Sequence, residues 1–537
     1  QNDSADYFLG GRDATWLAIG ASIFASNIGS EHLIGLAGAG ASSGMAMAHW
    51  EIQGWMILIL GWVFVPFYSR SMVYTMPEFL ERRYNPQSRT ILSVISLVSY
   101  VLTKVAVTVY AGGLVFQQVF GIKELWGIDF FWIAAIGLVV LTALYTIFGG
   151  MKSVLYTSVL QTPILLLGSL IILVLGFKEL GGWDEMMRVC GAVTVNDYGD
   201  TMTNLIRSND DANFPWLGAL IGSAIIGFWY WCTDQFIVQR VLSGKNEKEA
   251  RRGTIFGAYL KLLPVFLFLI PGMIAFALHQ KYIGAGGEGF LPMLANGTAN
   301  ADAAFPTLVA KLLPAGVKGL VVCGILAALM SSLASLFNSS AMLFTIDFYK
   351  RFRPETPEKK LVGIGQIATV VIVILGILWI PIMRSVGDVL YTYLQDVQSV
   401  LAPGIAAAFL LGICWKRTSA QGGMWGLIAG MIIGLTRLGA KVYYSNAGEV
   451  ADSTFKYLFY DMNWLFFCGW MFLFCIIVVI VVSLATEAPT AEKIQGLVFG
   501  TATKEQKAAT RASWDHWDII HTVIILAITG AFYWYFW

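Results

Sequence analysis

WLAIGASIFASNIGSEHLIGL, residues 16–36, is an apolar stretch long enough to cross a bilayer, yet polar residues interrupt its middle. The interruption runs from Ala25 to His32, near the depth at which lipid offers the backbone no hydrogen bonds. Broken backbone is tolerated there where protein shields it or where it lines a cavity. Its freed carbonyl oxygens can then bind a cation while neighbouring side chains bind a solute. The stretch therefore predicts the core of a transporter.

The composition is that of a protein whose solvent is lipid. Mean hydropathy is +0.67, and only 13% of the residues are charged, against about 25% in soluble domains. We expect about 13 transmembrane helices, at residues 16–36, 44–68, 90–120, 127–148, 152–176, 216–240, 254–279, 318–348, 362–383, 386–414, 421–440, 462–485 and 517–537.

The basic residues predict the orientation of these spans. Most of the 35 lysines and arginines fall in loops that are cytoplasmic if the N-terminus is cytoplasmic. The positive-inside rule therefore predicts a cytoplasmic N-terminus and a C-terminus outside. The expected location is a plasma-type (cell inner) membrane. The chain opens Gln1-Asn2-Asp3, without a methionine or a signal sequence, and we expect this numbering to begin downstream of a longer terminus.

Several function classes are disfavoured by the motifs. Five of the six cysteines fall in apolar spans, so we expect neither a disulfide framework nor a metal-ligand set. There is no P-loop after a strand, no HExxH and no GxSxG, and the basic runs are typical of loop flanks rather than of a nucleic-acid surface. We therefore expect a protein that is not an enzyme and that does not bind nucleic acid.

Two charged residues lie inside predicted spans. Glu51 and Lys261 each cost at least ~2.5 kcal/mol in lipid, so both must face a protein interior. One interpretation is a polar cavity in which a carboxylate accepts from a solute's hydroxyl groups and an ammonium donates to them; the other is a buried structural ion pair. Lys104 and Arg437 also lie in spans, but long basic side chains can reach out to the interface.

A small-residue motif, Ala328-Leu329-Met330-Ser331-Ser332, lies on another predicted span. Residues i, i+3 and i+4 share one face of a helix, so Ala328, Ser331 and Ser332 can present a carbonyl and two hydroxyls to one point. Hard oxygen ligands without a full charge suit a monovalent cation, because they hold it weakly enough for it to leave the site again. Small residues and serines also serve helix packing in membranes, which is the alternative interpretation.

A set of motifs in fixed order resembles the solute:sodium symporter family, in particular its sodium/glucose cotransporter branch. The motifs are Gly20-Ala21-Ser22-Ile23-Phe24-Ala25-Ser26-Asn27-Ile28-Gly29-Ser30, Tyr230-Trp231-Cys232-Thr233-Asp234-Gln235 with Val238-Gln239-Arg240, Tyr259-Leu260-Lys261-Leu262, Leu329-Met330-Ser331-Ser332-Leu333 and Trp415-Lys416-Arg417.

The resemblance implies an all-α integral membrane fold, a LeuT-type five-plus-five inverted repeat followed by further helices. The segments would be a cytoplasmic N-terminal segment (1–15), the first repeat (16–176), an extracellular loop (177–215), the second repeat (216–414) and C-terminal helices (415–537) with a cytoplasmic linker (487–515). The implied coupling ion is sodium.

The resemblance also implies site residues, carried over position by position. The sodium ion would be held by backbone oxygens of Ala25, Ile28 and Ala328 and the hydroxyls of Ser331 and Ser332. The sugar would be held by Asn27, His32, Glu51, Tyr230, Trp231, Lys261 and Gln395. The gates would include Tyr230 on the cytoplasmic side and Trp50 and Tyr391 in an outer lid. Packing or interfacial roles remain open for these aromatics.

Two positions depart from the family pattern. Ser158 stands where relatives often have an aspartate near the sodium ion, and Gly227 stands where some have a hydroxyl residue. The expected function is a secondary active symporter that couples inward sodium movement to uptake of a hexose-like sugar of the glucose or galactose type. The alternatives are another polyol or organic solute, such as inositol or sialic acid, and a membrane sugar sensor that does not transport. The oligomeric state is not predicted.

Overall fold

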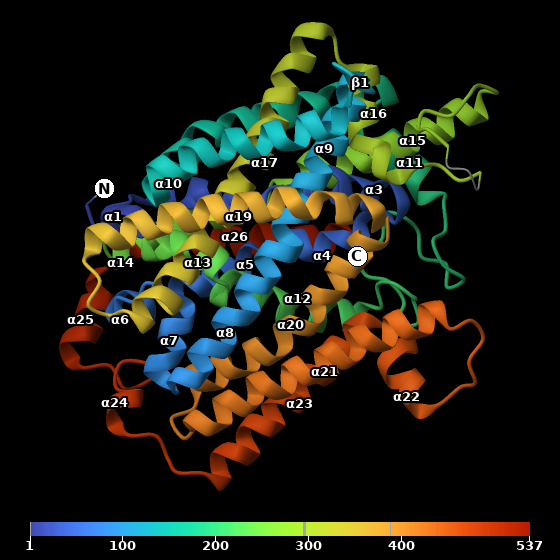
Figure 1. The fold of residues 1–537 in the computed structure, drawn as a ribbon. Helices are drawn as coiled ribbons and strands as arrows, with labels where there is room; N and C mark the ends of the chain where they lie inside the picture. Colours follow the sequence, from blue (N-terminus) through green and yellow to red (C-terminus); the bar gives the residue numbers. More distant parts are fainter. Residues whose placement is uncertain (1, 30, 294–296, 387) are drawn as a thin grey trace.

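The computed structural model describes residues 2–29, 31–293, 297–386 and 388–537, and it leaves out some further side chains, among them those of residues 379–397. Nearly all the elements are helices (Figure 1). In the first half they are α1 Ser4–Leu9, η1 Gly10–Arg12, α2 Trp16–Asn27, η2 Glu31–Leu36, α3 Ala37–Ser42, η3 Gly44–Met47, α4 Ala48–Glu51, α5 Gly54–Ile59, η4 Leu60–Phe64, α6 Val65–Ser71, α7 Met76–Arg83, α8 Pro86–Ser99, η5 Tyr100–Val105, α9 Ala106–Phe120, β1 Glu124–Leu125, β2 Ile128–Asp129, α10 Phe130–Leu180 and α11 Trp183–Gly191.

In the second half the elements are α12 Trp216–Gly227, η6 Phe228–Thr233, α13 Gln235–Leu242, α14 Glu247–Leu260, η7 Val265–Leu269, α15 Ile270–Gly284, η8 Ala301–Ala303, α16 Ala304–Leu312, α17 Ala315–Met342, η9 Leu343–Tyr349, α18 Lys350–Phe352, α19 Glu358–Val386, α20 Asp388–Cys414, α21 Ala420–Asn446, α22 Thr454–Lys456, η10 Tyr457–Asp461, α23 Trp464–Ala485, α24 Ala491–Ile494, α25 Lys504–Ala512 and α26 His516–Tyr535. The η segments are 3-10 or π-helical. The two short strands pair antiparallel, Glu124 opposite Asp129 and Leu125 opposite Ile128.

The first apolar segment is broken, as predicted from its sequence. Helix α2 ends at Asn27, and Ile28 is extended with φ −77° and ψ 117°. The chain becomes helical again only in η2, from Glu31. Helix ends leave backbone groups without intrahelical partners, so this break exposes polar backbone in the middle of the protein.

Three other membrane segments are interrupted at a few residues each. Between α4 and α5, Ile52 and Gln53 leave helical geometry, with φ −89° and ψ 49° at Ile52. Asp234 is extended (φ −81°, ψ 131°) between η6 and α13, and residues 261–264 separate α14 from η7. In a membrane such interruptions occur where protein or a cavity surrounds them.

Every expected span overlaps helical segments. Among the described residues, nine helices are long and apolar enough to cross a membrane, and shorter apolar helices occur at Trp16–Asn27 and Gln398–Cys414. Helix α10 overlaps two of the expected spans, 127–148 and 152–176. Gly150 (φ +59°, ψ −151°) breaks the helix between them. A side chain at Gly150 would also lie 2.3 Å from the carbonyl oxygen of Tyr7.

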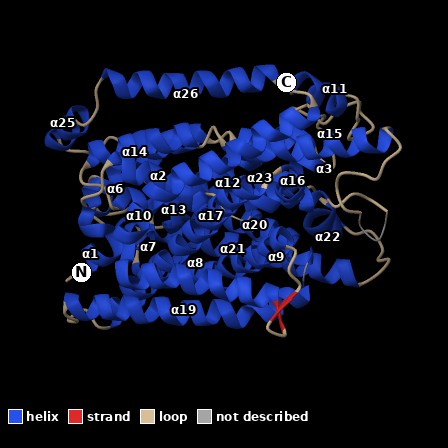
Figure 2. Ribbon diagram, turned by 90° about the horizontal axis from the view of Figure 1, so that it is seen from above, coloured by secondary structure: helices blue, strands red, loops and turns tan. Residues whose placement is uncertain are grey.

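The burial pattern is inverted relative to a soluble protein. Large apolar side chains such as Phe148, Leu160 and Trp470 are 62–72% exposed on the helices, whereas many polar side chains are buried between them. An apolar exterior over long helices is what a lipid environment selects. In Figure 2, α26 runs along one edge of the bundle and α19 along the opposite edge. The broken segments lie between these edges, where they are shielded.

Candidate functional site

A cavity of about 180 Å³ lies where the interrupted segments meet. This volume is below the roughly 300–1,000 Å³ of pockets for drug-sized ligands, so the cavity suits a compact solute. Its lining comes from the α2 break, from the segment around Glu51, from the end of α12 with η6, and from Lys261. The lining residues are Asn27, His32, Gly35, Leu36, Met47, Trp50, Glu51, Gln53, Phe214, Ile226, Gly227, Tyr230, Trp231, Lys261, Gln398 and Trp464.

The charged centre of the cavity is Glu51. Its Oε2 atom accepts from Lys261 Nζ at 2.7 Å and from His32 Nε2 at 3.2 Å. All three residues are at least 92% buried. Each one also lies at a helix interruption: Glu51 ends α4, Lys261 follows α14, and His32 lies in η2. The structure thus shows an ion pair, and it shows that both partners line the cavity.

Two polar atoms in the cavity wall are without partners. Asn27 Nδ2 and His32 Nδ1 are buried and have no hydrogen-bond partner among the described residues. Since an ionised carboxylate only accepts, His32 Nε2 carries the hydrogen toward Glu51, and the Nδ1 of a neutral ring is then an acceptor. A buried group left unsatisfied costs about 1–3 kcal/mol, so a hydroxylated solute that pairs with these atoms gains affinity.

Aromatic rings border the cavity on two sides. The Trp231 ring is 2% exposed and lies 5.2 Å from Lys261 Nζ. Tyr230 packs edge-on against Trp231, with ring centroids 4.9 Å apart. On another side Trp50 stacks on Trp464 at 5.7 Å and meets Phe214 edge-on at 5.8 Å. Such rings offer apolar faces to the C–H side of a ring-shaped solute.

Several of these lining residues were not predicted from the sequence. Phe214 and Trp464 lie far from Trp50 along the chain, and neither differs in sequence from an interfacial aromatic. Gln53 carried a signal, because it is a polar residue in an apolar span two positions after Glu51. The expected residues Tyr391 and Gln395 belong to α20, but their side chains lie outside the described part of the structure.

Ser332, one of the residues expected to hold a cation, lies beside the α2 break. A side chain at Gly29 would lie 3.1 Å from Ser332 Oγ, so α17 approaches the break closely. Within the described ranges no backbone N–H donates to the carbonyl oxygens of Ala25 or Ile28. Ala328, Ser331 and Ser332 are buried on α17. Free carbonyls opposite hydroxyls form an uncharged oxygen set that could hold a monovalent cation.

Helix α10 contributes residues beside this oxygen set. Ser331 Oγ donates to Gln161 Oε1, so the lone pairs of Ser331 stay available to accept. Thr162 Oγ1 donates to the Ala21 carbonyl at 3.3 Å and links α10 to α2. Ser158 is buried, and its hydroxyl donates within its own helix to the Val154 carbonyl at 2.7 Å. The position at which the family resemblance leads us to expect an aspartate thus holds a hydroxyl bonded to its own helix.

A second buried ion pair lies beside Tyr230. Lys104 Nζ is 3.2 Å from Asp234 Oδ2, and Tyr100 donates its hydroxyl to Asp234 Oδ1. The ammonium also lies 4.9–5.2 Å from the centroids of four rings, those of Tyr100, Trp229, Tyr230 and Phe236. Lys104 therefore does not reach the membrane interface. It fixes η5 to the break between η6 and α13.

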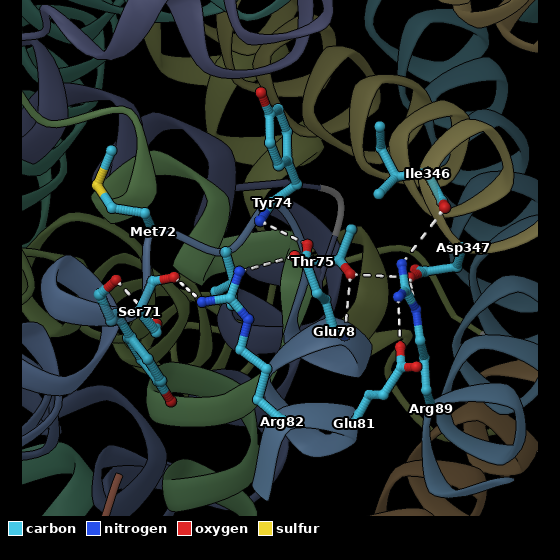
Figure 3. A network of polar contacts seen from close by, with 12 residues as sticks. Ser71, Met72, Tyr74, Thr75, Glu78, Glu81, Arg82, Arg89, Ile346 and Asp347 are labelled. Atoms are coloured by element: carbon cyan, nitrogen blue, oxygen red, sulfur yellow. Dashed lines mark hydrogen bonds and ion pairs between the residues drawn. The ribbon is translucent and has the colours of Figure 1, made fainter. Parts of the chain in front are cut away.

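A polar network joins the two halves of the chain at the end of α17 (Figure 3). Asp347 Oδ1 accepts from Thr75 Oγ1 at 2.9 Å and from Arg89 Nε at 2.8 Å. Arg89 also pairs with Glu81 at 2.5 Å. Thr75 in turn accepts from the backbone N–H of Glu78 and caps α7. This network ties α7 and α8 to η9.

One border of the cavity is held by a loop aspartate. Asp211 accepts from the backbone N–H of Phe214 at 2.7 Å, from that of Asn213 at 2.9 Å and from Asn196 Nδ2 at 2.8 Å. Burial alone would raise the pKa of Asp211, but these hydrogen bonds and nearby Arg207 lower it below its ordinary value. The ionised carboxylate thus fixes Phe214 against Trp50.

Comparisons with known proteins agree on one family. A model of the sodium:solute symporter family matches residues 7–430. Sodium/myo-inositol cotransporter 2 of Homo sapiens is 37% identical over 92% of this chain and 74% of its own length. Sodium/glucose cotransporter 1 of Ovis aries is 39% identical over 90% of this chain and 74% of its own length.

Solved structures show the same fold. The substrate-bound, outward-open structure of a Na+-coupled sialic acid symporter has a TM-score of 0.70 at 22% identity, covering 91% of this chain and 94% of that one. Mhp1, a nucleobase-cation-symport-1 family transporter, has a TM-score of 0.50 at 14% identity, covering 92% and 98%. The architecture is therefore the LeuT-like one expected from the sequence.

Proposed function

The chain belongs to the sodium:solute symporter family, and from that premise we propose that it imports a neutral hexose-like sugar together with sodium. It is a multi-pass membrane protein whose coupling ion is sodium. Sodium that moves inward through 100 mV supplies about 2.3 kcal/mol per charge, before its concentration gradient is added. Accumulation of a neutral solute then needs no other energy source.

The observation that carries the proposal is the Glu51 cluster in the cavity wall. Lys261 and His32 converge on one carboxylate oxygen. Asn27 Nδ2 and His32 Nδ1 stand beside them without partners among the described residues. A ring of hydroxyl groups, each able to donate and accept, suits this mixture, and the Trp231 face suits the ring's C–H side.

The charge of the cavity favours a neutral solute. Lys261 is compensated by Glu51 at 2.7 Å. Among the described lining residues there is no arginine and no second lysine. An anion such as sialic acid would need an uncompensated cation, because a buried carboxylate without one is costly.

The proposed coupling follows from one helix break. Ala25 and Ile28, whose carbonyls would bind sodium with Ala328, Ser331 and Ser332, flank Asn27, which would contact the sugar. A cation that fixes the break therefore also fixes a sugar ligand. Because binding of each stabilises the same backbone, each raises the affinity for the other.

The remaining assignments belong to the same proposal. The inverted repeats would be residues 16–176 and 216–414, with the N-terminus cytoplasmic and the protein in the plasma membrane. Tyr230 and Trp50 would close the sugar site on its two sides, and their ring contacts support this. Gln395 and Tyr391 stay in the proposal on the strength of the sequence.

A second candidate solute is myo-inositol. It is favoured by similar proteins, several of which are sodium/myo-inositol cotransporters at 36–38% identity. Inositol is likewise a neutral polyol with a compact ring, so the charge argument does not separate the two.

Uptake by purified protein in proteoliposomes tests the proposal. Radiolabelled glucose, galactose, myo-inositol and sialic acid are supplied under an imposed inward sodium gradient, with potassium and choline gradients as controls. We expect sodium-dependent accumulation of a hexose. Accumulation of inositol alone would replace the hexose assignment. Sugar binding without any accumulation would indicate a sensor instead of a symporter.

A further inference from the structure

Gln53 occupies the interruption between α4 and α5, two residues after Glu51. Its side chain is 3% exposed and lines the cavity. An amide in a membrane interior is costly unless it is hydrogen-bonded. Both polar atoms of the Gln53 side chain therefore need hydrogen-bond partners.

The orientation of the Gln53 carboxamide follows from its partners. Nε2 donates to the Ser223 carbonyl at 2.8 Å, and Oε1 accepts from Trp231 Nε1 at 3.3 Å. A carbonyl can only accept and an indole N–H can only donate, so the assignment of oxygen and nitrogen is unambiguous. Gln53 thereby connects α12 with η6 and fixes the ring of Trp231.

Half of the hydrogen-bonding capacity of this amide remains. A primary amide has two N–H donors and two carbonyl lone pairs, and Ser223 and Trp231 take one of each. Gln53 lines the cavity, and one of its N–H groups and one of its carbonyl lone pairs have no partner among the described residues. This pair matches two adjacent hydroxyl groups, one accepting and the other donating.

Gly227 makes room for this arrangement. A Cβ atom at residue 227 would lie 2.8 Å from Gln53 Oε1, 2.9 Å from Nε2 and 3.0 Å from Cδ. These separations are too short for real contacts, so any larger residue would push the amide off Ser223 and Trp231. The position of the Gln53 amide therefore depends on the absence of a side chain at residue 227.

We propose that Gln53, seated against Gly227, is a solute-contacting residue that sets specificity between polyols differing at one hydroxyl. The inference rests on the proposed function, since it takes the cavity to be the solute site. Gln53 reads a pair of adjacent hydroxyls through its remaining N–H and lone pair. In addition, it holds Trp231 in the orientation that faces the solute.

The test compares Gln53→Leu and Gly227→Ala with the wild type in proteoliposomes. The solutes are the transported polyol, its epimers and its single-deoxy analogues. For Gln53→Leu we expect the KM of the best solute to rise about 10-fold, from loss of two hydrogen bonds, and one deoxy analogue to be taken up as well as the parent. Gly227→Ala should move the same KM in the same direction without removing any polar group.

A double variant tests the physical link. In Gln53→Ala/Gly227→Ala the methyl group added at residue 227 no longer meets the Gln53 amide. The KM of this double variant should therefore equal that of Gln53→Ala alone. Additive effects of the two substitutions on KM would show that Gly227 does not position the Gln53 amide. Wild-type relative uptake of the deoxy analogues in Gln53→Leu would show that Gln53 does not contact the solute. If the wild type takes up no polyol with sodium, the proposed function fails instead. The sodium concentration for half-maximal binding, measured in detergent without sugar, should be unchanged in each variant, which shows that the variant is folded.

Discussion

Removal of the Glu51–Lys261 pair is the perturbation that separates a solute site from a structural ion pair. The two groups are 2.7 Å apart and buried. At an effective dielectric constant of ~20 their attraction is about 6 kcal/mol before desolvation is subtracted. Loss of one partner of a buried pair costs about 3–5 kcal/mol of stability, because the other charge remains. Glu51→Gln and Lys261→Met should therefore each lower the melting temperature.

Sugar affinity should respond differently from stability. Each single variant also removes a proposed hydrogen-bonding partner of the solute, worth about 1–3 kcal/mol, so the Kd for sugar should rise at least ~10-fold. The double variant leaves no uncompensated charge, and its melting temperature should recover most of the loss. Its sugar affinity should stay low, because both solute contacts are gone.

The assay is thermal unfolding and sugar binding of purified protein in detergent at saturating sodium. Lys281→Ala is a matched control. Lys281 lies at the end of α15, its side chain is 44% exposed, and it pairs with Glu185 of α11. Recovery of both stability and sugar affinity in the double variant would refute the solute contact and leave a structural ion pair. Wild-type sugar affinity in both single variants would put the pocket elsewhere.

The remaining predictions concern the cation and the outer lid. Ser332→Ala should raise the sodium concentration for half-maximal uptake more than it changes sugar affinity at saturating sodium. The control is Ser340→Ala on the same helix, α17. It removes a buried hydroxyl that has no hydrogen-bond partner among the described residues, so it should change neither quantity. Ser158 supplies no charge, so reversal potentials should give one sodium per sugar; Ser158→Asp should raise sodium affinity, since a carboxylate about 4 Å from the ion adds roughly 4 kcal/mol of attraction before desolvation. A measured ratio near two would show that Ser158 is not limiting. The lowered pKa of Asp211 means that its contribution to loop stability is complete above the unfolded value of about 3.9 and is lost as the pH falls through the folded value. The protection factor of the Phe214 amide, which compares its exchange rate with the intrinsic rate at the same pH, should therefore fall on acidification. Asp211→Ala should show the same fall at neutral pH, and an unchanged protection factor in both cases would contradict this role.

The sequence predicted those features that the membrane makes costly. The α2 break was predictable because polar residues stand in an apolar segment, and Glu51 and Lys261 had to face an interior because lipid excludes charge. Their interior positions are confirmed, while their roles stay predictions. The oxygen set at Ala328, Ser331 and Ser332 followed from helical spacing together with the family motif.

Other features depend on contacts that no local pattern encodes. Lys104 looked free to reach the interface, because its partner Asp234 lies 130 residues away along the chain. Phe214 and Trp464 reach the cavity only through the packing of a loop and a late helix. Gln53 was visible as a polar residue, but its seat against Gly227 exists only in three dimensions.

The most direct test of the account is whether sodium and sugar help each other to bind. Equilibrium binding of the transported sugar is measured in detergent with saturating sodium and with choline, and sodium binding is measured with and without sugar. Because both ligands would fix the backbone around Asn27 at the end of α2, we predict that each lowers the Kd of the other by the same factor. Sugar binding with equal affinity in sodium and in choline would contradict a shared site at the α2 break.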